Sequence, residues 1–252
     1  MHRVAISSTG IFTPPEVITN EELVAAFNAY AALENEKYAD EIAAGTRTAL
    51  TDSNVEFIEK ASGIKRRYVM NKSGVLDPRR MRPEFKARPD TEISMMAEIA
   101  VKAAQDALAN AGKTAADVDG VYCAAANMQR AYPAMGVEIQ TALGINGYAF
   151  DMNVACSSAT FALEMAYNAV RTGSARAILV VNPEITSAHL AWMDRDCHFI
   201  FGDVCTAILV ERLDRAPEGA FEILGTRLQT TFSNAIRNNA GFMSRAEDRD
   251  PE

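Results

Sequence analysis

One cysteine of this chain stands where its type and its neighbours could support covalent chemistry. Cys156 lies in the segment FDMNVACSSAT, residues 150–160, which predicts a buried strand that leads into the first turn of a helix. A thiol at a helix N-terminus lies near unpaired backbone N–H groups and the positive end of the helix dipole, and both favour the reactive thiolate. The alternative is an inert buried cysteine, the common fate of this residue type. Cys156 is therefore a candidate nucleophile.

The elements that must position Cys156 alternate between strands and helices. The helix after it, through about Arg171, is rich in alanine, with Glu164 as its one charged residue before the last turn, so we expect it to be buried on nearly all sides. Apolar residues at helical spacing predict another helix from Thr91, with Glu92 in its first turn and Gly112 as its terminator. Strand-like runs occur at residues 4–11, 120–126, 148–152, 177–181 and 205–210. A layered α/β domain follows.

The segments between these elements are more polar. A helix is predicted from Glu21 onward, and residues 31–52, rich in Ala and Glu without an apolar stripe, predict surface helices. Residues 54–61 predict a short helix that Asp52 or Ser53 caps and Gly63 ends. Residues 71–90 contain three prolines and few apolar side chains, which indicates a loop.

Composition limits the classes of function. The chain has 252 residues, of which 48% are hydrophobic and 23% charged, so one large or two small globular domains are expected. A formal charge of -8 argues against nucleic acid as a partner. No apolar stretch reaches the roughly 18 residues of a membrane span and no signal peptide is evident, so a soluble, cytoplasmic protein without a membrane partner is expected. No disulfide and no metal site is expected, because no CxxC pair or zinc-type spacing involves the four cysteines, Cys123, Cys156, Cys197 and Cys205.

Further motifs follow one another in an order typical of one family. They are VAISSTGIFTP and TNEEL at residues 4–14 and 19–23, EFI and SGIKRR at 56–58 and 62–67, RAYP, IQ and LGI between 130 and 145, and DR before FGD at 194–203. With the segment around Cys156, this set resembles the β-ketoacyl-acyl carrier protein synthase III family of thiolase-fold condensing enzymes. The resemblance extends, with interruptions, from residue 4 to about residue 212.

The resemblance implies a thiolase-like α/β fold, in which two similar halves place central helices between two sheets. On this basis residues 1–213 are an N-terminal half-domain with a central buried helix and with insertions at about 31–52 and 71–90. Residues 218–252 would begin a second half, with 218–231 as its opening strand. We therefore expect the sequence to be a fragment in which the second half is largely missing and which alone is inactive in condensation.

The resemblance also implies a two-stage acyltransferase reaction that starts fatty-acid or related chain synthesis. An acyl-CoA acylates Cys156, and a carbanion from decarboxylating malonyl-acyl carrier protein then attacks the acyl-enzyme. Coenzyme A enters as a thioester substrate, and no cofactor is expected. The family's histidine and asparagine, from the second half, match no position here. His198 stands near the FGD motif, but the aligned family position is apolar, so a core histidine is preferred to a Cys156–His198 dyad.

Residue by residue, the resemblance implies three substrate-binding positions. Phe57 stands where the family has a tryptophan that stacks on the CoA adenine, although a core phenylalanine is the alternative. Arg195 matches an arginine on the other side of the adenine. Tyr132 occupies the place of a phenylalanine that crosses the dimer interface and lines the partner's acyl pocket. A family arginine that contacts the nucleotide phosphate falls on Ala61, which departs from the pattern.

Partners follow from the resemblance and from charge. A homodimer is implied, and the apolar strand at 121–126 is expected to be an edge that pairs across a two-fold axis. The loop at 71–90 carries six basic and three acidic residues, so it is either a docking surface for an acidic acyl carrier protein or a solvated loop. Gly202 and Asp203 predict a structural turn. Three alternatives stay open: acyl transfer without condensation, a longer acyl-CoA primer, and a non-catalytic thiolase-fold subunit that pairs with an active partner.

Overall fold

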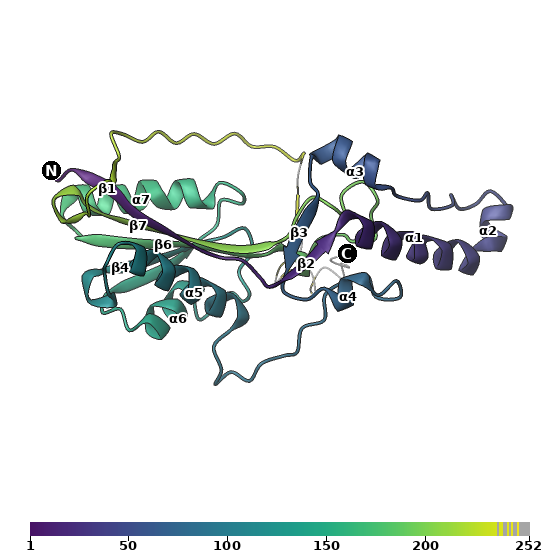
Figure 1. Ribbon diagram of the computed structural model, residues 1–252, viewed down its shortest axis with the longest axis horizontal. Helices are drawn as coiled ribbons and strands as arrows, with labels where there is room; N and C mark the ends of the chain where they lie inside the picture. Colours follow the sequence, from purple (N-terminus) through teal and green to yellow (C-terminus); the bar gives the residue numbers. More distant parts are fainter. Residues whose placement is uncertain (236, 239–240, 242, 244–245, 247–252) are drawn as a thin grey trace.

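The computed structural model describes residues 1–235, 237–238, 241, 243 and 246 (Figure 1). Its centre is a mixed sheet in the order β5-β4-β6-β7-β1-β8. β4 is parallel to β5 and β6, whereas β7 is antiparallel to β6 and β1, and β8 is antiparallel to β1. The bounds are β1 Val4–Phe12, β4 Gly120–Ala124, β5 Tyr148–Met152, β6 Ala177–Ile185, β7 Asp203–Arg212 and β8 Phe221–Glu222.

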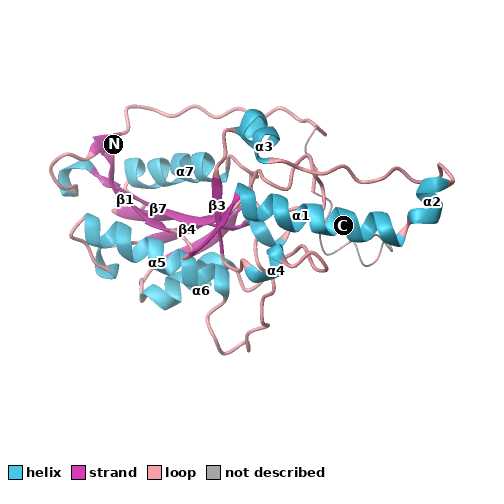
Figure 2. Ribbon diagram, turned by 45° about the vertical axis from the view of Figure 1, so that its right-hand side comes forward, coloured by secondary structure: helices cyan, strands magenta, loops and turns pink. Residues whose placement is uncertain are grey.

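Helices cover both faces of this sheet. α5 (Met95–Asn110) and α6 (Met135–Leu143) lie on one face, and α7 (Ser158–Thr172) lies on the other (Figure 2). Side chains alternate between the two faces along a strand. In β4, Val121 and Cys123 therefore join the core under α5 and α6, and Tyr122 and Ala124 join the core under α7. Because helices cover both faces of β4, this strand is apolar throughout. The layered α/β prediction is confirmed.

α7 buries only one of its faces. Ala162, Ala166 and Val170 recur every four residues and pack on the sheet, whereas Met165 and Asn168 on other sides are exposed. The expectation that this helix is buried on nearly all sides is wrong for the described part of the chain. The sheet covers α7 from one side, and a second layer would be needed to cover the other.

A smaller substructure lies beside the end of the sheet. It contains a two-stranded antiparallel sheet and a third core around Trp192, Phe27 and Leu23. Its first helix begins at a capping box, in which Thr19 and Glu22 bond each other's backbone N–H groups. The elements are β2 Glu16–Thr19, β3 Arg66–Val69, α1 Asn20–Lys37, α2 Ala39–Ala43, α3 Val55–Ser62 and α4 Ser73–Leu76.

Several element bounds differ from those expected. α3 is capped by Asn54, whose side chain accepts a hydrogen bond from the Phe57 N–H at 2.7 Å, and not by Asp52 or Ser53. α5 begins after its cap Ser94, so Glu98 and not Glu92 lies in its first turn. Asn, Asp and Ser side chains can all cap a helix, and tertiary contacts decide which one does.

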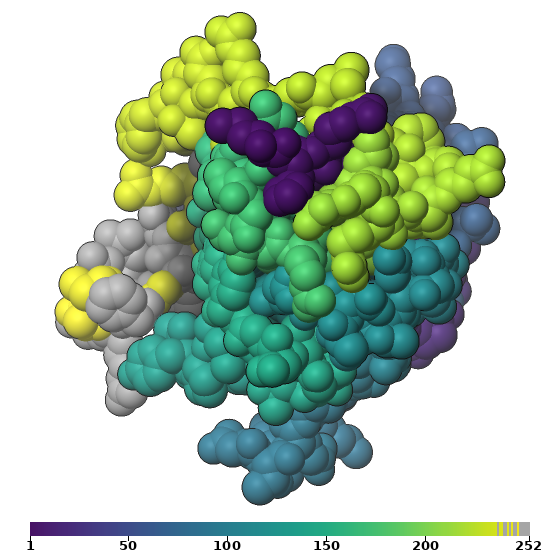
Figure 3. All heavy atoms as spheres, turned by 90° about the vertical axis from the view of Figure 1, so that its left-hand side faces the viewer, coloured from purple at the N-terminus to yellow at the C-terminus, as the bar shows by residue number. Residues whose placement is uncertain are grey.

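The two polar segments adopt different structures. The segment 31–52 is helical in its first part, as the end of α1 and as α2, and continues as irregular chain. The segment 71–90 is irregular apart from α4, and the loop from α4 to α5 projects from the body of the molecule (Figure 3). Three short 3-10 helices complete the described elements: Ala115–Asp117, Thr186–Ala188 and Leu213–Arg215.

Two expectations about strands are wrong. β4 is not an edge strand, because it lies between β5 and β6, and β5 forms the edge of the sheet. Of the strand expected at 218–231, only β8 is paired in the described part of the chain; it meets β1 at Ala5 and Ile6. The four cysteines are free thiols, and none of the described helices has the length and apolarity to cross a bilayer.

Candidate active site

Cys156 lies in the turn that joins β5 to α7, and it is exposed. The residue before it, Ala155, has φ +47, a left-handed conformation that residues other than glycine rarely adopt. Such a conformation costs on the order of 1–3 kcal/mol and persists where surrounding contacts impose it. The turn therefore holds the backbone of Cys156 in a defined direction at the end of the strand.

Hydrogen bonds on both sides of Cys156 impose this turn. The Ala155 N–H donates to the Asn153 side-chain oxygen at 2.9 Å, and the Val154 N–H donates to the Ser158 hydroxyl oxygen at 2.8 Å. The Ser158 hydroxyl donates in turn to the Ala155 carbonyl at 2.7 Å. Ser158 is buried, so its bonds are shielded from water. Asn153 and Ser158 act as positioning residues for the thiol.

Cys156 precedes α7 and does not belong to its first turn. Ser157 is the cap of α7 and Ser158 its first residue, so the predicted place within the first turn is off by two residues. Cys156 still follows the carboxyl end of β5, which lies beside the carboxyl end of the parallel strand β4. Ligands of α/β proteins bind at such carboxyl ends. The effect of the α7 dipole on the thiolate stays a prediction.

The three strand ends are tied to one another. Asn153, after β5, donates its side-chain N–H to the Ala126 carbonyl at 2.8 Å. The Ala126 N–H, after β4, donates to the Glu184 carboxylate at 2.5 Å. Burial raises the pKa of Glu184 near the end of β6. Sequence reasoning missed Asn153, Ser158 and Glu184, although the first two are polar residues within three positions of the cysteine.

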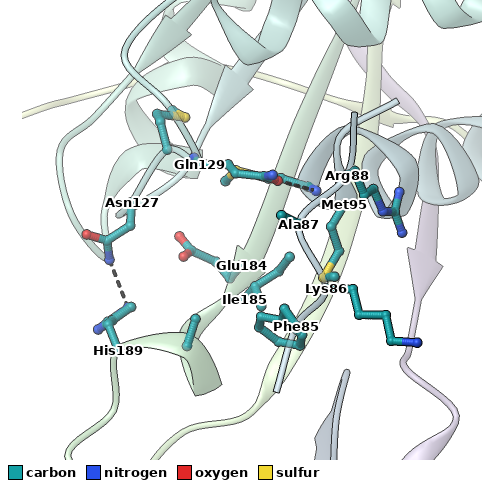
Figure 4. A pocket seen from close by; sticks show the side chains of 13 residues that line it. Phe85, Lys86, Ala87, Arg88, Met95, Asn127, Gln129, Glu184, Ile185 and His189 are labelled. Carbon is teal, nitrogen blue, oxygen red and sulfur yellow. Dashed lines mark hydrogen bonds between the residues drawn. The ribbon is translucent and has the colours of Figure 1, made fainter. Parts of the chain in front are cut away.

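A cavity of about 360 Å³ opens beside these strand ends (Figure 4). Residues 85–88 line one side of it, and Asn127 and His189 line the opposite side. Met95, Met128 and Ile185 supply apolar surface between them. Cys156 itself does not line the cavity.

Comparisons with known proteins agree with this geometry. The family model of 3-oxoacyl-[acyl-carrier-protein (ACP)] synthase III matches residues 150–231, which include the Cys156 turn. A β-ketodecanoyl-[acyl-carrier-protein] synthase of Pseudomonas aeruginosa is 57% identical over 224 residues, 88% of this chain and 64% of the relative. The chain is similar to the 3-oxoacyl-[acyl-carrier-protein] synthase III family. A β-ketoacyl-[acyl-carrier-protein] synthase III of Granulibacter bethesdensis is 29% identical over 91% of this chain and 58% of its own length.

A solved structure of the same family gives the fold. The chain matches the crystal structure of 3-oxoacyl-[acyl-carrier-protein] synthase III from Aquifex aeolicus with a TM-score of 0.61 and 26% identity, over 83% of this chain and 54% of that one. The expectation of a thiolase-like fold is confirmed. The chain spans between about half and two thirds of the length of these synthase III relatives.

Two residues that the family resemblance singled out contact each other. The Arg195 guanidinium lies 4.0 Å from the centre of the Phe57 ring, and its Nε donates to the Asp52 carbonyl at 2.8 Å. Phe57 also meets Phe199 edge to face, with ring centres 5.8 Å apart. A planar cation over an aromatic face is a favourable contact. An adenine placed between Phe57 and Arg195, as in the synthase III family, would have to replace this contact.

Tyr132 lies apart from these residues, on the loop between β4 and α6. Its side chain is 85% exposed. Arg130 and Glu138 form an ion pair at 2.6 Å on the same segment, so the loop is fixed near its base. The structure leaves the phenol of Tyr132 available at the surface and does not bring it into the cavity.

His198 is a core residue, as preferred from the sequence. Its side chain is fully buried, packs edge to face on Phe27 with ring centres 4.7 Å apart, and bonds the Ser53 hydroxyl through Nε2 at 3.2 Å. Burial, and next the charges of Arg67 and Arg195, lower the pKa of His198 to about 4. A neutral ring with these neighbours has a structural role.

The Gly202–Asp203 turn is also structural. The buried Asp203 carboxylate accepts hydrogen bonds from the Met70 N–H at 2.8 Å and from the Ser187 N–H and hydroxyl at 2.8 and 2.7 Å. At Gly202, a side-chain carbon would stand 2.6 Å from the Tyr68 carbonyl oxygen, so only glycine fits. This turn joins the large sheet to β3.

Proposed function

We propose that this chain supplies the nucleophile of a condensing acyltransferase. The Cys156 thiolate attacks the carbonyl of an acyl-CoA, and coenzyme A leaves as its thiol. Malonyl-acyl carrier protein then loses carbon dioxide, and its carbanion attacks the acyl-cysteine carbonyl. β-Ketoacyl-carrier protein forms, and the thiolate of Cys156 is released. The proposal includes no cofactor and no metal.

The exposed turn around Cys156 is the main support for this proposal. A nucleophile needs access to substrate and a fixed direction of attack. The left-handed Ala155 and the bonds of Asn153 and Ser158 supply the direction, and exposure supplies the access. Similarity to the synthase III family agrees with this role of the cysteine.

The relative from Pseudomonas aeruginosa favours a primer longer than acetyl. It is named for a β-ketodecanoyl product, which has ten carbons. Because condensation with a malonyl unit adds two carbons, the matching primer has eight. Octanoyl-CoA is therefore the primer that we propose, in agreement with the longer-primer alternative raised by the sequence.

Phe57 and Arg195 are proposed to bind the adenine of coenzyme A. Their present contact places an aromatic face and a planar guanidinium opposite each other. Rotation of the Arg195 side chain, which is partly exposed, would admit a purine between them. Both groups can stack on a purine, and the guanidinium can in addition bind a phosphate.

A cytoplasmic homodimer is proposed as the working form. The outer edge of β5 has no strand partner in the described part of the chain, and such an edge can pair with a second copy across a two-fold axis. The exposed Tyr132 would then extend towards the partner's acyl site. A phenol there makes the site more polar than the family's phenylalanine does.

The projecting loop is proposed as the docking surface for the acyl carrier protein. Arg79, in the turn just after α4, is exposed, and the loop carries a net positive charge on an acidic chain. Neutralising Arg79, Arg80 and Arg82 together should weaken carrier-dependent turnover and leave acylation by acyl-CoA unchanged. Equal losses in both assays would rule this docking surface out.

Product analysis with the intact protein tests the proposed function. The protein is incubated with octanoyl-CoA and malonyl-acyl carrier protein, and the mass of the carrier is measured. We expect β-ketodecanoyl-carrier protein from the wild type and none from Cys156→Ala. Release of coenzyme A without a β-ketoacyl product would instead support acyl transfer without condensation. Absence of both reactions would support the non-catalytic subunit.

A further inference from the structure

Glu184 is the one charged residue of β6, and its side chain is partly buried beside the cavity (Figure 4). Burial raises the pKa of its carboxyl group, and the hydrogen bond from the Ala126 N–H opposes this rise. A carboxylate that is partly removed from water lowers stability, and groups of this kind are concentrated at functional sites. The partner of the Glu184 side chain, Ala126, indicates what its function is.

Ala126 lies just beyond the part of β4 that is paired with β5. The pairing of these strands ends at Ala124, which lies opposite Met152. Both backbone groups of Ala126 are instead bound by side chains: its N–H donates to the Glu184 carboxylate at 2.5 Å, and its carbonyl accepts from the Asn153 amide at 2.8 Å. Because strand pairing no longer holds Ala126, these two side chains set its position.

Asn153 connects Ala126 to the turn that carries Cys156. Its amide nitrogen donates to the Ala126 carbonyl, and its amide oxygen accepts from the Ala155 N–H at 2.9 Å. Ala155 has the left-handed conformation, with φ +47, and directly precedes Cys156. If Ala126 moves, Asn153 loses one of the two bonds that orient its side chain, and the costly conformation of Ala155 loses support. Three successive hydrogen bonds thus lead from Glu184 to the residue before the thiol.

We propose that Glu184 is a positioning residue for Cys156, and that it acts through Ala126 and Asn153. The proposal rests on the proposed function, because the direction of the thiol matters for its attack on a thioester. Glutamine at position 184 keeps an acceptor oxygen of the same reach and removes the charge. Aspartate keeps the charge but withdraws the acceptor by one methylene, and alanine leaves the Ala126 N–H without a partner.

Hydrogen exchange tests the positioning without any substrate. The exchange rate of the Ala155 N–H is measured by NMR in the wild type and in the three Glu184 variants, and circular dichroism checks that each variant is folded. We expect Glu184→Ala and Glu184→Asp to accelerate this exchange about tenfold, because the turn opens more often without its support. Glu184→Gln should accelerate it less than about threefold, since the acceptor remains but its bond loses the assistance of the charge.

Asn182→Ala is the matched control. Asn182 lies two residues before Glu184 on β6, hence on the same face of the strand, and its side chain donates to the Ala124 carbonyl at 2.9 Å. This variant also removes a side-chain bond to the segment after β4, but at a residue that is still paired with β5. Exchange at Ala155 should therefore stay within about threefold of the wild-type rate.

Acylation by octanoyl-CoA provides the second measurement. Glu184→Ala and Asn153→Ala should each slow acylation of Cys156 at saturating thioester with KM unchanged, and the double variant should be no slower than either single variant, because both act through one path. Unchanged exchange at Ala155 in Glu184→Ala and Glu184→Asp, equal acceleration by Asn182→Ala, or additive losses in the double variant would overturn the assignment. If exchange behaves as expected but the wild type takes no acyl group, the proposed function fails and the positioning role stands.

Discussion

Acidification should destabilise this protein through His198. The ring is fully buried, and its pKa of about 4 lies below the ordinary value of 6.5. A depressed pKa in the folded state means that the unfolded state binds the proton more tightly. The stabilisation by the neutral ring is therefore complete above about pH 6.5 and is lost as the pH falls towards 4.

The size of this effect follows from the two pKa values. The full difference corresponds to about 3 kcal/mol, and the part lost between pH 7.5 and pH 5.0 is about 2 kcal/mol. Replacing His198 with leucine removes the titrating group and keeps an apolar side chain of similar size. Leucine leaves the Ser53 hydroxyl without its partner, which lowers stability equally at every pH.

Urea denaturation at pH 7.5, 6.0 and 5.0 measures the difference. The free energy of unfolding of the wild type should fall by about 2 kcal/mol more than that of His198→Leu between the two extremes. Carboxylates that titrate in the same range affect both proteins alike and cancel in the comparison. Parallel pH profiles of wild type and variant would refute the reasoning.

Three further predictions concern the site. Ser158→Ala removes the hydroxyl that bonds Val154 and Ala155. It should lower the free energy of unfolding in urea by about 1 kcal/mol and slow acylation by acyl-CoA. Unchanged acylation would show that the turn does not need this hydroxyl. Phe57→Ala and Arg195→Ala should each raise the KM for acyl-CoA and leave that for acyl-pantetheine, which has no adenine, unchanged; losses with both substrates would contradict adenine binding. Tyr132→Ala should keep the dimer in sedimentation but change chain-length preference, and an unaltered preference would place Tyr132 outside the acyl site.

The sequence allowed the strands and the Cys156 turn to be predicted because their signals are local. Tyr148–Met152 was predicted with the observed bounds, and β1, β4, β6 and β7 were predicted with errors of a few residues at their ends. β2 and β3 were not predicted, and β8 is much shorter than the strand expected at 218–231. Which strand forms the edge was predicted wrongly, since β4 and β5 are both apolar and the order of strands depends on distant pairings. The exposed face of α7 escaped prediction for a similar reason, because its composition is suited to burial that the described part of the chain does not provide.

The site was predictable in part. Phe57 and Arg195, far apart in sequence, contact each other, which spacing alone could not show. The family resemblance placed them on opposite sides of an adenine, and that role stays a prediction. His198 was expected in the core because the aligned position is apolar. The cavity could not be foreseen, since it forms where residues 85–88 fold against the ends of β4 and β6. Such contacts depend on tertiary packing. The loop is polar and contains prolines, so it has no periodic apolar pattern from which this packing could be predicted.

The central claim is that the exposed sulfur of Cys156 carries the acyl group. Mass spectrometry of peptides from the intact protein, digested after brief incubation with octanoyl-CoA, measures this directly. We predict an octanoyl adduct on the peptide that contains Cys156 and none on the peptides of Cys123, Cys197 or Cys205. An unmodified Cys156, or an adduct confined to another cysteine, would contradict the account.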